Sequence, residues 1–158
     1  IEDTILPGDA AYDFDLAVAR IRAAASAARA LPHDFILTAR ADGVMIGSYD
    51  TGEAIKRLQG FADAGADCLY APMPPDMAAL AQICASVNRP VNALIAGNFA
   101  GQSLEDFAKA GVARLSLGSA LARVTHRAIF DAAQEMFGGR FGHLQNGIDS
   151  AIIDQMME

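Results

Sequence analysis

The chain has 158 residues, 53% of them hydrophobic and 7% aromatic, which suffices for one packed domain and is short for two of ordinary size. Its 19 acidic and 12 basic residues give a net charge of −7 without a basic stripe, which argues against a nucleic-acid or anionic-membrane surface. No apolar run of membrane-spanning length is present. The first residues lack a secretion-signal pattern, so we expect a cytoplasmic protein.

Short apolar strands alternate with helical patterns along the chain. Strands are predicted at 1–3, 35–40, 67–72, 91–96 and 113–118, and helices at 13–30, 51–64, 75–87, 103–110 and 119–137. Such alternation predicts a parallel sheet with right-handed crossovers. Length alone favours an open doubly wound sheet, because a closed eightfold barrel typically needs about 250 residues. However, residue 1 already lies inside a predicted strand, which suggests a chain whose beginning is missing.

The segment DFILTARADG, residues 34–43, ends an apolar strand with a permanent charge. Arg40 needs a partner, because burying its charge unpaired is prohibitive. Strand alternation places Thr38 and Arg40 on one face. An adjacent strand at 1–3 would bring Glu2 close to Arg40.

Five blocks, IED, TARAD, AIKRLQGFADAGADCLYAP, RPVNALIAG and GVARLSLGSAL, resemble in order and spacing the isocitrate lyase/phosphoenolpyruvate mutase superfamily. The resemblance covers residue 1 to about residue 137 and is strongest to short bacterial phosphonomutase- or methylisocitrate-lyase-like members. It implies an α/β fold, a parallel (β/α) barrel of TIM type, present here as roughly its C-terminal five βα units, strands four to eight. It also implies a Mg²⁺-dependent carbon–carbon lyase that acts on a small α-oxo or α-hydroxy carboxylate through an enolate-like intermediate.

The resemblance assigns site residues to the strand ends, where barrels hold their active sites. Glu2 matches a glutamate that holds the metal through water, and an exposed strand-end acid is the alternative. Arg40, the expected catalytic residue, matches an arginine that binds a substrate carboxylate; a structural Arg–Glu pair is the alternative. Asn92 faces inward as a substrate ligand or a core amide. Gly118 and Ser119 open the last long helix, where backbone N–H groups favour an anion and a serine N-cap is the alternative.

The segment TILPGDAAYDFD departs from the family. Lyases carry a Lys-Lys-Cys-Gly-His block there, whose cysteine is the catalytic acid or base, and mutases carry a lysine–asparagine pair. Neither is present, so isocitrate cleavage and phosphoryl transfer lose support. The carboxylate-binding half of such a site still allows enolate stabilisation in C–C cleavage or decarboxylation. The competing hypothesis is a non-catalytic truncated half-barrel that acts as a binding or self-associating module and covers its open sheet edges.

We expect a partial barrel domain over 1–142 and a helical tail over 143–158. In LQNGIDSAIIDQMME the apolar residues Leu144, Ile148, Ile152 and Met156 form one helical stripe. Family members exchange their last helices between subunits. The resemblance therefore implies a homo-oligomer with an exchanged C-terminal helix, a small carboxylate substrate, and neither nucleic-acid nor membrane partners.

Overall fold

The computed structural model describes all 158 residues, which form two compact units, Ile1–Gly118 (unit 1) and Ser119–Glu158 (unit 2). This division falls earlier in the chain than the boundary expected after residue 142. The assignment of a 1–142 domain with a 143–158 tail stays a prediction. None of the helices combines the length and the apolar character that crossing a membrane requires.

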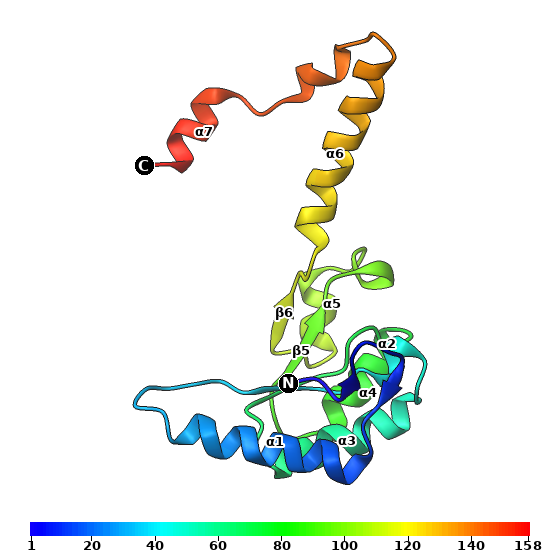
Figure 1. Ribbon diagram of the computed structural model, residues 1–158, viewed down its shortest axis with the longest axis vertical. Helices are drawn as coiled ribbons and strands as arrows, with labels where there is room; N and C mark the ends of the chain where they lie inside the picture. Colours follow the sequence, from blue (N-terminus) through cyan, green and yellow to red (C-terminus); the bar gives the residue numbers. More distant parts are fainter. The chain divides into compact units, whose positions relative to one another are not determined.

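Unit 1 contains short strands and helices in alternation (Figure 1). In chain order these are β1 (Thr4–Ile5), β2 (Ala10–Ala11), α1 (Phe14–Arg29), β3 (Thr38–Arg40), α2 (Gly43–Ile46), α3 (Thr51–Asp63), β4 (Cys68–Tyr70), α4 (Met77–Ser86), β5 (Val91–Leu94), η1 (Gly97–Phe99), α5 (Leu104–Lys109) and β6 (Arg114–Ser116).

The main sheet is parallel, with its four strands in the order β3-β4-β5-β6. Each strand lies beside its successor in the chain, as βαβ units with short connections require. The register places Arg40 opposite Tyr70, Tyr70 opposite Asn92, and Asn92 opposite Arg114. The predicted parallel α/β arrangement is therefore confirmed. The strand expected at 1–3 is reduced to one parallel bridge between Glu2 and Arg40.

The hydrophobic core joins the helices to one face of this sheet. Odd-numbered strand residues such as Ala39, Leu69 and Val91 pack with Ile21 of α1 and Phe61 of α3 in one buried cluster. A second buried cluster extends the core with residues of α4, β5 and α5, and its β5 residue also occupies an odd-numbered position. Fully burying a large apolar side chain contributes about 1.5–3 kcal/mol. Because the helices gather on this face, the doubly wound alternative is wrong.

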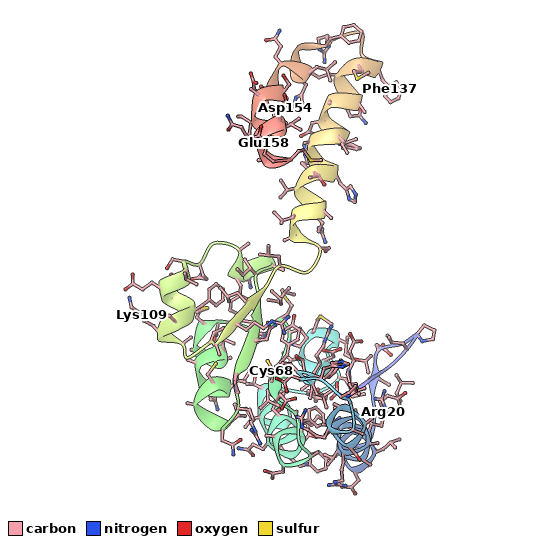
Figure 2. All side chains as sticks on the ribbon, turned by 90° about the vertical axis from the view of Figure 1, so that its left-hand side faces the viewer. Arg20, Cys68, Lys109, Phe137, Asp154 and Glu158 are labelled. Atoms are coloured by element: carbon pink, nitrogen blue, oxygen red, sulfur yellow. The ribbon has the colours of Figure 1, made fainter.

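Local sequence signals set the helix boundaries. Aspartates precede four of the helices and accept a hydrogen bond from the first turn, namely Asp13, Asp50, Asp76 and Asp149. Beyond α3 and α5, Gly65 and Gly111 adopt positive φ values of 104° and 86°, which favour glycine at the end of a helix. Both cysteines, Cys68 and Cys84, are free thiols. Figure 2 shows the labelled Cys68 within unit 1.

Two features of unit 1 were not predicted. The segment 4–11 forms an antiparallel hairpin of β1 and β2 around a turn with Pro7 and Gly8. Helix α2 follows β3 directly and ends at Gly47 in the left-handed conformation. Both elements are too short to show a hydrophobic period in the sequence.

Unit 2 consists of α6 (Ala120–Phe137), η2 (Gly142–Asn146) and α7 (Ser150–Met156). The single amphipathic helix expected across the tail is wrong, because extended backbone at Gly147 and Asp149 separates two short helices. Leu144 and Ile148 therefore do not share a helix with Ile152. None of the three helices has a buried residue, and Figure 2 shows side chains projecting around α6.

Candidate functional site

A cavity of about 350 Å³ lies on the sheet face opposite the core. The lining residues of the four strands all occupy even-numbered positions, which face away from the core. The remaining lining residue, Gly118, lies beyond the end of β6. The lining residues are Thr38, Arg40, Tyr70, Asn92, Leu94, Arg114, Ser116 and Gly118. Leu94 is the one aliphatic side chain among them, so the cavity suits a small polar ligand.

Arg40 ends β3 and is held by two carboxylates. Its Nη1 lies 2.7 Å from Oε1 of Glu2, and its Nε donates to Oδ1 of Asp42 at 3.0 Å. The guanidinium also lies 5.1 Å from the centre of the Tyr70 ring, within cation–π range. The predicted proximity of Glu2 and Arg40 is confirmed. The guanidinium keeps free N–H groups for a ligand, because the two acids use only some of its five donors.

Asp42 is the buried member of this group. It is 1% exposed, and its Oδ2 accepts a hydrogen bond from the Thr4 hydroxyl at 3.3 Å. Burial raises the pKa of the Asp42 carboxyl above its ordinary value, although the neighbouring Arg40 charge opposes this rise. Removing Arg40 would therefore strand Asp42 in the protein interior, whereas Glu2 is partly exposed.

Asp3 connects the strand ends to the helices behind them. Its carboxylate accepts hydrogen bonds from the backbone N–H of Asp42 at 2.8 Å, the Tyr49 hydroxyl at 2.7 Å and Nη1 of Arg57 at 3.1 Å. The Nε of Arg57 also donates a hydrogen bond to Oε1 of Glu53 at 3.0 Å. Burial raises the pKa of Tyr49, and its bond to Asp3 adds to the rise. The group fixes the backbone position of Asp42, and through it the orientation of Arg40.

Sequence reasoning missed this supporting group. Neither Asp3 nor Arg57 is among the predicted site residues. A signal for Arg57 exists: it lies three residues after Ala54 and directly before Leu58, both of which are buried. A charge inside the apolar stripe of a helix indicates a buried partner.

Asn92 on β5 is 2% exposed. Its Nδ2 donates to Oγ of Ser116 at 2.9 Å. Its Oδ1 is buried and has no hydrogen-bond partner, the single case of this kind among the buried side-chain polar atoms. A buried, unpaired acceptor costs stability and is a frequent mark of a binding site. The role of Asn92 as a substrate ligand stays a prediction.

Two further residues of the cavity were not singled out from sequence. Tyr70 lies between Arg40 and Asn92 in the register, and burial raises the pKa of its hydroxyl. Arg114 begins β6 and is exposed. Their positions at strand ends on the even-numbered face could have indicated them.

The two residues expected at the last long helix divide between the units. Gly118 lines the cavity and adopts a φ of 52°, a conformation that favours glycine. Ser119 begins unit 2 as the N-cap residue of α6, and its side chain makes no capping hydrogen bond. Anion binding by Gly118 and Ser119 stays a prediction.

The residues present fit a magnesium ion only in part. Mg²⁺ takes one or two carboxylates and retains waters, and Glu2 is a partly exposed carboxylate at a strand end. Asp3 and Asp42 are already committed to protein donors. No group of three or more metal-binding side chains occurs. These residues thus offer one outer ligand rather than a complete metal site.

A larger cavity, of about 510 Å³, lies at the opposite ends of the strands around His33, Phe35 and Ile36. Its lining includes the exposed ion pair of Arg29 with Asp67. The Asp67 carboxylate also accepts the backbone N–H of Leu37 at 2.8 Å, and the hydrogen bond from Arg29 lowers its pKa. These contacts hold the start of β3, at the ends of the strands away from Arg40 and Asn92. We therefore assign the site to the smaller cavity.

The fold and this site define an α/β protein with polar and charged side chains gathered on the free face of a parallel sheet. A family model described as Phosphoenolpyruvate phosphomutase matches residues 1–137. The chain belongs to this family, within the phosphoenolpyruvate mutase/isocitrate lyase superfamily. Its structural neighbours include lyases and mutases.

Among solved structures, a presumed lyase/mutase of Burkholderia cenocepacia J2315 is 39% identical with a TM-score of 0.92, covering 99% of this chain and 57% of that one. An oxaloacetate acetylhydrolase in complex with the inhibitor 3,3-difluorooxalacetate is 25% identical with a TM-score of 0.77, covering 90% and 51%. An uncharacterised protein of Mycobacterium tuberculosis (strain ATCC 25618 / H37Rv) is 37% identical over 70 residues, 44% of this chain and 26% of that protein. The chain thus spans little more than half of the first structural relative and about a quarter of the curated one.

Proposed function

We propose that the chain is the substrate-binding part of a lyase-type enzyme that acts on a small α-oxo or α-hydroxy carboxylate by C–C cleavage or decarboxylation. The observation that carries the proposal is Arg40, held at a strand end beside a cavity that also contains the unpaired oxygen of Asn92. Both groups are polar and oriented before any ligand binds. Preorganised polar groups of this kind stabilise charge that develops on a substrate.

In this proposal Arg40 binds the substrate carboxylate with its free N–H groups and acts as the catalytic residue. Asn92 and the backbone at Gly118 and Ser119 contribute further hydrogen bonds. The fixed donors hold the carboxylate in place while negative charge builds on the neighbouring oxygen of an enolate-like intermediate. The oxaloacetate acetylhydrolase neighbour, a complex with a dicarboxylate analogue, supports a ligand of this class.

Magnesium is the cofactor of the proposal, with Glu2 as its water-mediated ligand. A bound Mg²⁺ would stabilise negative oxygen during the reaction. Since Glu2 alone does not form a complete site, we assign no reaction step to the metal. The proposed cellular location is the cytoplasm.

A second proposal concerns self-association, and it is favoured by unit 2. All of its large apolar side chains are exposed, including Leu121, Val124, Phe130 and Phe137. Soluble monomers rarely leave so much apolar surface open. We propose that the chain forms a homo-oligomer by exchange of its C-terminal helix, with or without catalysis.

Substituting Arg40 tests the enzyme proposal. Arg40→Lys should retain the fold and weaken binding of oxalate and pyruvate by about ten- to hundredfold, because lysine lacks the planar two-donor geometry. Binding is measured on the 158-residue chain by chemical-shift titration in NMR, with and without Mg²⁺. The matched control is Arg29→Lys, an exposed arginine paired with Asp67 at the other end of the strands. Unchanged affinity in Arg40→Lys, with a lowered melting temperature, would assign Arg40 a purely structural role.

A further inference from the structure

Tyr70 is the aromatic side chain of the cavity, and its ring and its hydroxyl have different surroundings. The residue ends β4 and is 8% exposed, so most of the ring is buried. The Arg40 guanidinium lies over this ring, 5.1 Å from its centre. Both residues line the cavity. The ring thus supports Arg40, which leaves the role of the hydroxyl to be explained.

The Tyr70 hydroxyl takes part in none of the side-chain hydrogen bonds of the cavity. The nearby Ser116 hydroxyl is already hydrogen-bonded to the Asn92 amide, with 2.9 Å between Ser116 Oγ and the amide nitrogen. Tyr49 differs in this respect, because its hydroxyl donates to Asp3 at 2.7 Å. Tyr70 is therefore the tyrosine at this end of the sheet whose hydroxyl is left free by the fold.

The free hydroxyl is open to solvent. The one side-chain polar atom that is both shielded from solvent and unpaired belongs to Asn92 and not to Tyr70. An unpaired Tyr70 hydroxyl is consequently accessible, whereas its ring is buried. Because the residue lines the cavity, a ligand in the cavity reaches the hydroxyl without any rearrangement of the core.

The hydroxyl is a hydrogen-bond donor at neutral pH. Burial raises the pKa of Tyr70 above its ordinary value of 10.0, although the Ser116 hydroxyl and the Arg40 charge oppose this rise. A phenol that keeps its proton donates a hydrogen bond. Arg40 and Tyr70 are register partners on adjacent strands, which lie about 4.8 Å apart. A cation and a neutral donor therefore stand side by side.

We propose that the Tyr70 hydroxyl donates a hydrogen bond to the 2-oxygen of the substrate whose carboxylate Arg40 binds. This inference rests on the proposed function and adds a catalytic residue to that site. In a 2-oxo or 2-hydroxy carboxylate, this oxygen is attached to the carbon next to the carboxylate. Two groups on adjacent strands match that arrangement, with the carboxylate at the guanidinium and the 2-oxygen at the phenol.

The same hydrogen bond favours the intermediate over the substrate. When a 2-oxo acid becomes an enolate, its 2-oxygen gains negative charge. A hydrogen bond to a charged acceptor is about twice as strong as one to a neutral acceptor. Tyr70 thus stabilises the enolate-like state more than the bound substrate, which is what lowers a reaction barrier.

Three ligands separate the carboxylate from the 2-oxygen in NMR titrations of the 158-residue chain. Propionate has the carboxylate alone, pyruvate adds a neutral 2-oxygen, and oxalate has a negative oxygen there. Tyr70→Phe retains the ring beneath Arg40 and removes only the hydroxyl. It should leave propionate affinity unchanged and weaken pyruvate about threefold and oxalate about tenfold. The matched control, Tyr12→Phe, lies outside the cavity and should alter none of them.

The unaltered chain provides a second readout, which decides the matter if Tyr70→Phe does not fold. The chain has three tyrosines, and each is labelled with carbon-13 at Cζ, the atom that carries the hydroxyl. Pyruvate and oxalate should shift the Tyr70 signal more than propionate does, with Tyr12 and Tyr49 as internal references. A ring that only supports Arg40 would respond equally to all three ligands.

Unchanged pyruvate and oxalate affinities in Tyr70→Phe, or equal losses for all three ligands, would overturn the inference. An equal response of the Tyr70 signal to the three ligands would overturn it as well. Oxalate binding that depends on Arg40 but not on Tyr70 would contradict the inference and leave the proposed function standing. If none of the three carboxylates binds, both proposals fail.

Discussion

Arg57 and Asp3 form a buried ion pair across 54 residues of sequence, with 3.1 Å between Nη1 and Oδ2. Their side chains are 8% and 1% exposed. The pair joins α3 to the residues beside the end of β3, and Asp3 in turn holds the backbone of Asp42. The position of Arg40 at the cavity thus depends on a salt bridge whose residues do not line the cavity.

Breaking this pair should destabilise unit 1 strongly. Arg57→Met leaves the Asp3 carboxylate buried without its charge partner, which typically costs about 3–5 kcal/mol in the free energy of unfolding. Urea denaturation followed by circular dichroism measures the loss. The control is Lys109→Met, which removes the exposed pair with Glu105 on α5 and should cost at most about 0.5 kcal/mol. Similar losses in the two variants would refute a structural role for the buried pair.

Gly43→Ala should disturb the hydrogen bonds of Asp3 through another of its partners, Tyr49. A Cβ at Gly43 would overlap the ring of Tyr49, whose hydroxyl donates to Asp3. Displacing the ring should cost about 1–3 kcal/mol in unfolding free energy, more than the gain in helix propensity. Gly101→Ala is the matched control, because nothing lies within 4 Å of the added atom. A thermal melt of each variant decides the outcome, and equal melting temperatures would show that Tyr49 moves without cost.

The pH dependence of stability should reveal the burial of Asp42. Its pKa is raised above the ordinary 3.8, so the folded state binds a proton that the unfolded state has already lost. Its stabilising contribution is therefore complete below pH 3.8 and disappears as the pH rises through the higher folded value. The unfolding free energy of the unaltered chain, relative to Asp42→Asn, should fall across this window.

Carboxyl-carbon NMR provides a direct check on this assignment. Asp42 should titrate above 3.8 and Asp67 below it, because the hydrogen bond from Arg29 lowers the pKa of Asp67. A midpoint for Asp42 at or below that of Asp67 would mean that Arg40 outweighs burial.

Self-association is expected through unit 2. Sedimentation equilibrium at micromolar concentration should show a dimer or larger species, since the apolar side chains of this unit are open to solvent. Phe137→Asp should weaken association, whereas Leu104→Asp, at a similarly exposed apolar position on α5, should not. A strict monomer for the unaltered chain would contradict the proposal.

Alternating strand and helix patterns were sufficient to predict a parallel sheet, although five strands were expected and the sheet has four, with residues 1–3 reduced to one bridge. These signals are local, repeat along the chain, and leave few topologies once crossovers must be short and right-handed. The resemblance added the family, and the adjacency of the strands at 1–3 and 35–40 placed Glu2 beside Arg40. The prediction of one helix across the tail was wrong, because a hydrophobic stripe alone does not indicate where the backbone becomes extended, as it does at Gly147 and Asp149.

The composition of the site was decided by tertiary structure. The sequence does not show that Asp3 is the partner of the buried Arg57, that Ser116 contacts the Asn92 amide, or which of the even-numbered strand residues share a cavity with Arg40. Both of these contacts join residues at least 24 positions apart, so each depends on which strands and helices become neighbours. The sequence by itself determined which side chains face away from the core, because strand alternation is a property of the backbone. Which charges are balanced there depends on the packing, because compensation requires a partner within a few ångströms in space.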